Sequence, residues 1–105
     1  MKRYDALSAL QQERALSWHL ANILHQLIDG MMALDNEHIQ HAIDRAIERA
    51  YFEGRPAMAF AYILQDPARV VVVRELARIA AKDSWYAENG EIVLHEHNQV
   101  WSEQI

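Results

Sequence analysis

Histidine and carboxylate side chains recur in this chain at spacings that could bind a divalent metal. His38 and His41 lie one helical turn apart, and Glu37 precedes His41 by four residues, so the three could meet on a helix surface. His95 and His97 would share one face of a strand. Neither pair has a definite third and fourth ligand nearby, so we expect solvent-facing histidines and no metal or cofactor. Only the two pairs together, within one chain or across a dimer, would make a metal site.

Nucleophilic and phosphate-binding motifs are missing from the sequence. The chain has no cysteine, which excludes a disulfide, a thiolate zinc site and a cysteine nucleophile. No serine lies in a nucleophile elbow, and the three glycines form no phosphate-cradling loop. The carboxylates between residues 37 and 48 interleave with Arg45 and Arg49, which is typical of a solvated, salt-bridged helix face. We therefore expect a protein that is not an enzyme.

A basic ridge is expected where Arg74, Arg78 and Lys82 follow one another at steps of four residues. The ridge could contact nucleic acid, a nucleotide or an acidic protein. It could instead lie in solvent, or pair with Glu75 and with the acidic residues of the second long helix. The formal net charge of −5 argues against nucleic acid, because affinity for phosphates depends on neutralising cations.

Trp18 is the residue that points most directly to a binding surface. On a helical wheel it lies roughly 160° from the centre of its helix's apolar stripe, beside Asn22 and His25. A neighbouring helix packed on that stripe cannot cover it. The candidates to do so are the C-terminal segment with Trp101, a second copy of the chain, or a different protein. We favour a homodimer, because apolar residues on two sides of a helix are typical of small dimers.

The first of two long helices is expected over residues 9–29. Ser8 and Gln11 form a capping box at its start, and Gly30 can close its end. Leucines and isoleucines at spacings of three and four line one stripe of this helix.

The second long helix is expected over residues 36–53, with Asp35 as its cap and Gly54 as its stop. Its apolar stripe is rich in alanine, which allows close approach. The two stripes should mate, so the pair should form an antiparallel helical hairpin.

Two segments in the middle of the chain could each be either a helix or a strand. Residues 57–64 could be a short buried helix or an alternating strand, and we favour the helix. Asp66 and Pro67 then start a further helix that ends near Lys82, with the acid as cap and proline at the first helical position. The four valines at 70–73 lose rotamer freedom in a helix and could instead form a strand.

A β-hairpin is expected after this helix. Asn89-Gly90 favours a two-residue type I′ turn between strands at 84–88 and 91–95. That turn implies three facing pairs: Trp85 with Leu94, Tyr86 with Val93, and Ala87 with Ile92. The alternative is a helix that continues to residue 88 and is closed by Gly90.

Composition predicts a folded, cytoplasmic protein of one domain. The 105 residues are 51% hydrophobic and 24% charged, which is outside the range of disordered chains. The longest apolar runs are far short of the ~20 residues that span a bilayer, and no secretory signal is visible. We expect a mainly α (α+β) fold: the helical hairpin as core, two further helices and a small C-terminal β-hairpin.

These features together favour a non-enzymatic, protein-binding module that acts as a regulator, inhibitor or adaptor by occupying a partner's surface. Small virus-encoded proteins that block host defence belong to that class, by analogy of size and charge alone. The binding residues would be Trp18, Asn22, His25, the basic ridge and Trp101. The alternatives are a small-ligand or nucleotide-binding protein with a pocket at a dimer interface, and a metal-dependent enzyme using the histidine pairs.

Overall fold

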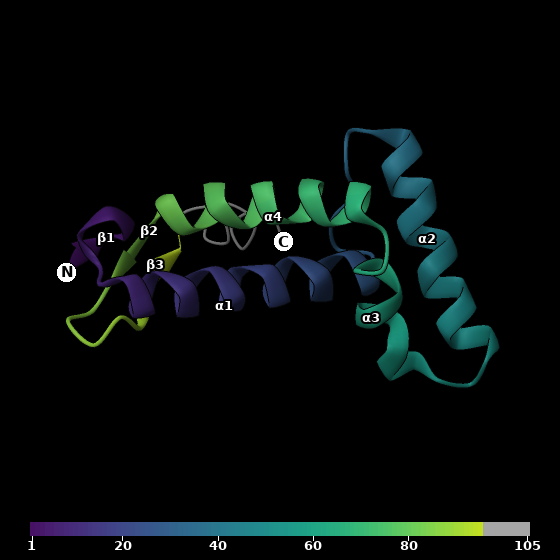
Figure 1. Cartoon of the computed structure of the whole chain (residues 1–105), viewed down its shortest axis with the longest axis horizontal. Helices are drawn as coiled ribbons and strands as arrows, with labels where there is room; N and C mark the ends of the chain where they lie inside the picture. Colours follow the sequence, from purple (N-terminus) through teal and green to yellow (C-terminus); the bar gives the residue numbers. More distant parts are fainter. Residues whose placement is uncertain (96–105) are drawn as a thin grey trace. The chain divides into compact units, whose positions relative to one another are not determined.

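The computed structural model describes residues 1–95, which form four α-helices and a three-stranded antiparallel sheet (Figure 1). In chain order the elements are β1 (Lys2–Arg3), a 3-10 helix (Tyr4–Ala6), α1 (Ala9–Ile28), α2 (Glu37–Phe52), a second 3-10 helix (Pro56–Met58), α3 (Ala59–Ile63), α4 (Pro67–Lys82), β2 (Ser84–Tyr86) and β3 (Ile92–His95). The mainly helical class with a small C-terminal hairpin is therefore confirmed.

The chain divides into two compact units. One joins Met1–Ala21 to Glu75–Ile105, and the other is Asn22–Arg74, so α1 and α4 each contribute to both. The single domain expected over residues 1–105 stays a prediction, because two such units can belong to one domain.

Local capping signals set where α1 and α4 begin. The Ser8 N–H donates to Gln11 Oε1 at 3.1 Å, and the Gln11 N–H donates to Ser8 Oγ at 3.2 Å, which is the predicted capping box. At α4 the Ala68 N–H donates to Asp66 Oδ1 at 2.8 Å, and Pro67 occupies the first helical position. Both helix starts are confirmed.

The second long helix, α2, begins one residue later than expected. Its N-cap is Asn36 rather than Asp35, and the Asn36 side chain accepts a hydrogen bond from the Ile39 N–H at 3.1 Å. Both residue types are good caps, so their order in the sequence does not choose between them. The end of α2 closes as predicted at Gly54, whose φ is +70°.

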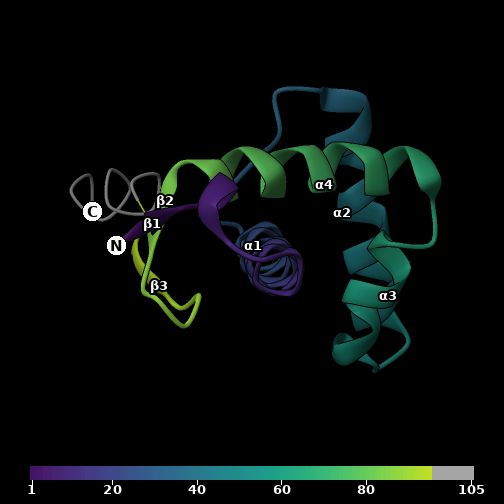
Figure 2. The same ribbon diagram turned by 60° about the vertical axis from the view of Figure 1, so that its left-hand side comes forward.

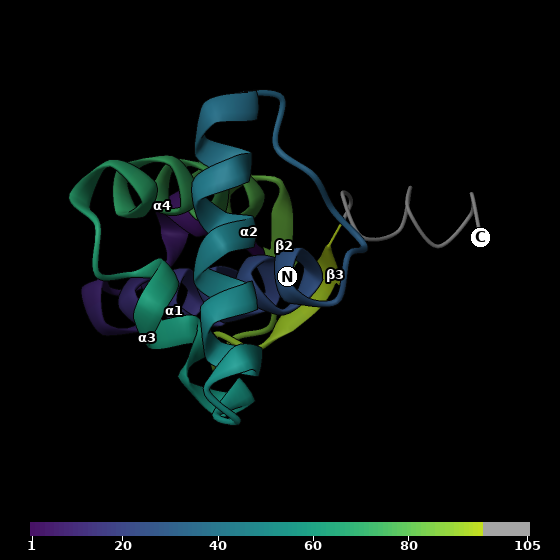
Figure 3. The ribbon, with the colours of Figure 1, turned by 90° about the vertical axis from the view of Figure 1, so that its right-hand side faces the viewer.

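Within the Asn22–Arg74 unit, α2 packs on α3 and on the 3-10 helix before it (Figure 3). The buried residues of the two α-helices are Ile43, Ala46 and Ala50 of α2 with Ala59, Tyr62 and Ile63 of α3. In Figures 1 and 3, α2 runs across the direction of the last turns of α1 rather than alongside them. The alanine-rich face of α2 thus packs closely on the short helix, and not in the antiparallel hairpin with the first long helix that the sequence predicted.

Both ambiguous segments are helical. The 3-10 helix and α3 together cover most of residues 57–64, and the four valines lie inside α4. Val73 is fully buried whereas Val71 is 67% exposed. Residues two apart share a face in a strand but not in a helix, so this difference in burial is what a helix produces.

The sheet has β2 at its centre, with β1 and β3 antiparallel on either side (Figure 2). Lys2 pairs with Tyr86, and Arg3 pairs with Trp85. The Arg3 guanidinium carbon lies 4.0 Å from the centroid of the Trp85 ring, in a cation–π contact. A two-residue strand has too few residues for a recognisable alternation, so β1 was not predicted.

The register of the hairpin is partly as predicted. Trp85 lies opposite Leu94, which is confirmed, but Tyr86 lies opposite Ile92 because a β-bulge shifts the pairing. The bulge adds Val93 to the outer strand, where this side chain is half exposed. The two facing pairs predicted nearer the turn are therefore wrong.

Candidate functional site

The turn between β2 and β3 is a three-residue loop. The Gly90 N–H donates to the Ala87 carbonyl at 2.9 Å, and the Ala87 N–H donates to the Glu91 carbonyl at 2.8 Å. Gly90 has a φ of +88°, whereas the φ of Asn89 is not positive. A type I′ turn needs a positive φ at both central residues, so the predicted two-residue turn is wrong. The additional loop residue accounts for the shifted register of the strands.

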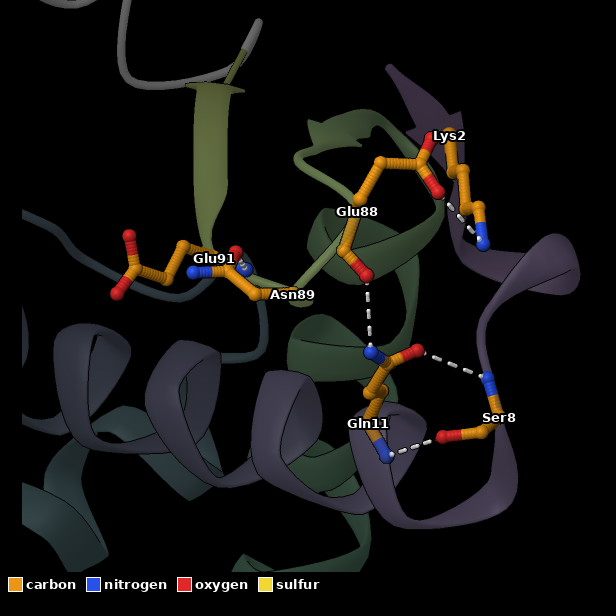
Figure 4. A network of polar contacts seen from close by, with 6 residues as sticks. All are labelled: Lys2, Ser8, Gln11, Glu88, Asn89 and Glu91. Carbon is orange, nitrogen blue, oxygen red and sulfur yellow. Dashed lines mark hydrogen bonds and ion pairs between the residues drawn. The ribbon is translucent and has the colours of Figure 1, made fainter.

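The side chain of Gln11 fixes this turn against the first turn of α1 (Figure 4). Its Nε2 donates to the Glu88 carbonyl at 3.2 Å, while its Oε1 accepts from the Ser8 N–H in the capping box. The Glu88 carboxylate also lies 3.2 Å from Lys2 Nζ. One glutamine therefore caps a helix and anchors a turn that lies 77 residues further along the chain.

The backbone of the turn approaches Gln11 closely. A Cβ added at Gly90 would lie 3.0 Å from Gln11 Cγ and 3.3 Å from Gln11 Cβ. Only glycine combines the positive φ with this approach.

Gly90→Ala should lower the free energy of unfolding by about 1–2 kcal/mol through the left-handed conformation alone, and by more through displacement of Gln11. Gly54→Ala is the matched control, because Gly54 has a φ of +70° and no atom within 4 Å of an added Cβ. Urea denaturation of both variants measures the difference. Equal losses would show that the contact with Gln11 has no energetic role.

A groove lies between the anchored turn and the adjacent face of α1. It has a volume of about 650 Å³, and it is lined from α1 by Arg14, Ala15 and Trp18 and from the hairpin by residues 89–92. Trp18 is 47% exposed, so a large aromatic surface is open to solvent beside the groove. Half-exposed tryptophans are frequent anchors at protein interfaces.

The groove carries one cation and one anion besides its apolar surface. Arg14 and Glu91 are both exposed residues of its lining. Among residues 1–95 neither makes an ion pair. The apolar lining, from Trp18 and the partly buried Ile92, is thus accompanied by two charges that are open to a ligand.

A fully buried polar cluster of His19, Ser84 and Tyr86 lies beside the sheet, in the same unit. His19 Nε2 is 3.1 Å from the Tyr86 hydroxyl and 3.4 Å from Ser84 Oγ. The Tyr86 hydroxyl donates to the Ala81 carbonyl at 2.7 Å, and Ser84 Oγ donates to the Ala80 carbonyl at 2.9 Å. These carbonyls belong to the last turn of α4, where intrahelical donors run out.

The hydrogen bonds of this cluster determine its protonation. Each hydroxyl has a single hydrogen, and each already donates it to a carbonyl, so both can only accept from His19 Nε2. His19 Nε2 therefore carries a hydrogen and cannot act as a base toward Ser84. Burial is the main cause that raises the pKa of the Tyr86 hydroxyl to about 12. The cluster resembles a serine–histidine pair in distance, but its bonds cap a helix.

The predicted binding residues differ in exposure and in contacts. Trp18 is exposed and Asn22 is half-buried. The His25 ring packs edge-on against Phe60 of α3, with 4.7 Å between the ring centroids. Trp101 lies outside the described residues.

The predicted basic ridge is exposed at all three of its positions, Arg74, Arg78 and Lys82. Arg78, however, donates two hydrogen bonds to the carboxylate of Glu75, at 2.5 and 3.1 Å, and this pairing raises the pKa of the guanidinium. The ridge therefore carries less free charge than its sequence indicates.

The histidine and glutamate side chains weighed as candidate metal ligands do not form a cluster within the described part of the chain. His38 and His41 are exposed on α2, and His97 is not among the described residues. No group of three or more histidine, aspartate or glutamate side chains that could hold a metal ion occurs in residues 1–95.

The hairpin's part in the groove was not predicted from the sequence. Locally, Gln11 fits a helix cap, and Asn89 and Gly90 fit a turn. No local pattern indicates that these residues meet, because the contact joins segments far apart in the chain. The close approach at Gly90 is visible only in three dimensions.

Comparison with known proteins finds no match to this chain among family models, curated proteins or solved structures. Within residues 1–95, every helix is too short or too polar to cross a bilayer. The function is therefore inferred from the geometry alone.

Proposed function

We propose that this protein is a non-enzymatic binding module whose groove, lined by Trp18, holds a segment of a partner protein. The observation that carries the proposal is the half-exposed indole beside a groove of about 650 Å³ whose second wall is fixed to the same helix. A wall that is already ordered lowers the entropy lost on binding.

The lining specifies the chemistry of the partner segment. Trp18 and Ile92 offer an apolar surface to an aliphatic or aromatic side chain. Arg14 would pair with an acidic residue next to that side chain, and Glu91 with a basic one. Such a partner would place an apolar side chain in the groove, with charged residues at its edge, which matches the apolar centre and polar rim of many interfaces.

In this proposal the protein acts as a regulator, inhibitor or adaptor by covering its partner's surface. We also propose a cytoplasmic location, which the absence of cysteine supports.

Capture of proteins from a lysate of the native host tests the proposal. The wild type, Trp18→Ala and Phe52→Ala are each immobilised, and the proteins that they retain are compared. Trp18→Ala should weaken retention of the partner roughly tenfold or more, since truncation of an interface tryptophan typically costs over about 1.4 kcal/mol. Phe52→Ala is the matched control, because Phe52 is 94% exposed and lies on α2, outside the groove. A protein retained equally by all three would contradict the proposal.

The homodimer expected from the sequence stays a prediction with its own measurement. Sedimentation equilibrium of the wild type and of Trp18→Ala would separate the two occupants of the groove. Loss of self-association in the variant would assign the groove to a second copy rather than to a different protein.

A further inference from the structure

Three arginines surround a small cavity in the Asn22–Arg74 unit. The cavity has a volume of about 180 Å³ and is lined by Arg45 and Arg49 of α2, Arg69 of α4, Tyr62 of α3, Gln65, and two alanines of α2. No acidic residue belongs to this lining. Three arginines therefore line one cavity in a chain whose net charge is −5.

Arg69 is held in place by the backbone. Its Nε donates to the Ile63 carbonyl at 2.9 Å and one terminal nitrogen donates to the Tyr62 carbonyl at 2.8 Å. Its other terminal nitrogen lies 3.7 Å from an Asp66 carboxylate oxygen, and its side chain is only 16% exposed. This guanidinium is therefore already ordered, so little entropy is lost when it meets a ligand.

Arg49 is positioned by Tyr62 and Glu53. Its guanidinium carbon lies 3.9 Å from the centroid of the Tyr62 ring, and its Nε donates to Glu53 Oε1 at 3.1 Å. The Tyr62 hydroxyl donates to the other oxygen of Glu53 at 2.5 Å. These two hydrogen bonds, first that of Tyr62 and then that of Arg49, lower the pKa of Glu53. The ionised carboxylate thus holds Arg49 in a fixed orientation over the ring.

Arg45 is the cation that the surroundings leave uncompensated. Among residues 1–95 it makes no ion pair and no side-chain hydrogen bond. Glu53 offsets the charge of Arg49, and Asp66 lies near Arg69. One positive charge of the three therefore remains for a ligand.

We propose that this cavity binds the phosphate group of a small phosphorylated molecule or free phosphate. The planar guanidinium matches oxyanions with paired N–H donors, which is why arginine predominates in phosphate recognition. A cavity of 180 Å³ holds the equivalent of roughly six waters at about 30 Å³ each, enough for one phosphate group. A whole nucleotide needs more, since pockets for larger ligands run from about 300 Å³ upward.

This site differs from the nucleotide pocket considered from the sequence. That pocket was assigned to Arg74, Arg78 and histidines at a dimer interface, whereas Arg45, Arg49 and Arg69 come from one chain. It is also independent of the groove at Trp18.

Isothermal titration with inorganic phosphate and, separately, with glycerol phosphate tests the inference at constant ionic strength. Arg45→Gln should weaken binding about tenfold or more, because a hydrogen bond to a charged group typically contributes at least that factor. Arg55→Gln is the matched control, since Arg55 is exposed in the same unit and does not line the cavity. Circular dichroism of both variants should match the wild type.

Two outcomes of the titration distinguish the sources of the phosphate. Tighter binding of the ester identifies a phosphorylated small molecule, and equal or tighter binding of inorganic phosphate identifies the free ion. Equal binding by wild type and Arg45→Gln, a response to sodium chloride as large as that to phosphate, or no heat at millimolar ligand would each overturn the proposal.

Discussion

Replacing Tyr86 with alanine is expected to lower the free energy of unfolding by about 3–5 kcal/mol, the range for truncating a buried aromatic residue. Tyr86 is fully buried and clusters with Leu7 and Ala15, with Tyr4 and Ile92 packed around them. The truncation would remove the largest side chain of this cluster and leave a cavity. Urea denaturation followed by far-ultraviolet circular dichroism measures the loss.

Tyr86→Phe separates the contribution of the hydroxyl to stability from that of the ring. The variant keeps the packing but leaves the Ala81 carbonyl and His19 Nε2 without the hydroxyl, at a cost of about 1–3 kcal/mol. Tyr51→Phe is the matched control, because Tyr51 is 58% exposed and should tolerate the loss of its hydroxyl. A Tyr86→Phe protein as stable as wild type would show that the hydroxyl does not contribute to capping α4.

Alkaline pH should destabilise the protein through the same hydroxyl. The pKa of Tyr86 is raised from an ordinary 10.0 to about 12 in the folded state, mainly by burial. The unfolded chain therefore releases this proton at lower pH than the folded protein does. The stabilisation by the Tyr86 hydroxyl is fully present below pH 10. As pH rises toward 12, the free energy of unfolding falls by about 2–3 kcal/mol.

Tyr86→Phe also isolates this pH dependence, because phenylalanine has no proton to release. The urea midpoint of the wild type should fall more steeply between pH 10 and 12 than that of the variant. A smaller fall should remain in the variant, since burial and the charge of Asp5 also raise the pKa of Tyr4. Parallel curves for the two proteins would show that Tyr86 titrates as it does in the unfolded chain.

The two proposed sites can be tested separately. The groove at Trp18 is built entirely from the first unit and the arginine-lined cavity entirely from the second. Trp18→Ala should leave phosphate binding unchanged, and Arg45→Gln should leave retention of a partner protein unchanged. Failure of one proposal therefore leaves the other intact.

Helix caps and helix ends could be predicted from the sequence because they depend on residues that are close together in the chain. The Ser8–Gln11 capping box, the Asp66-Pro67 start of α4 and the closure of α2 at Gly54 each depend on residues within one turn of each other. Helical class and the existence of a hairpin followed from such signals. The exposure of Trp18 followed from helical periodicity.

Tertiary structure alone decided the contacts between distant segments. The Gln11 side chain could bond to any carbonyl within reach, and only the folded chain places that of Glu88 there. Burial of His19 depends on Ser84 and Tyr86 arriving from β2, and the face that Arg45 and Arg49 present becomes a cavity only when Arg69 is added from α4. Local propensities do not predict these contacts, because each contact is set by packing between elements rather than by any signal within one element.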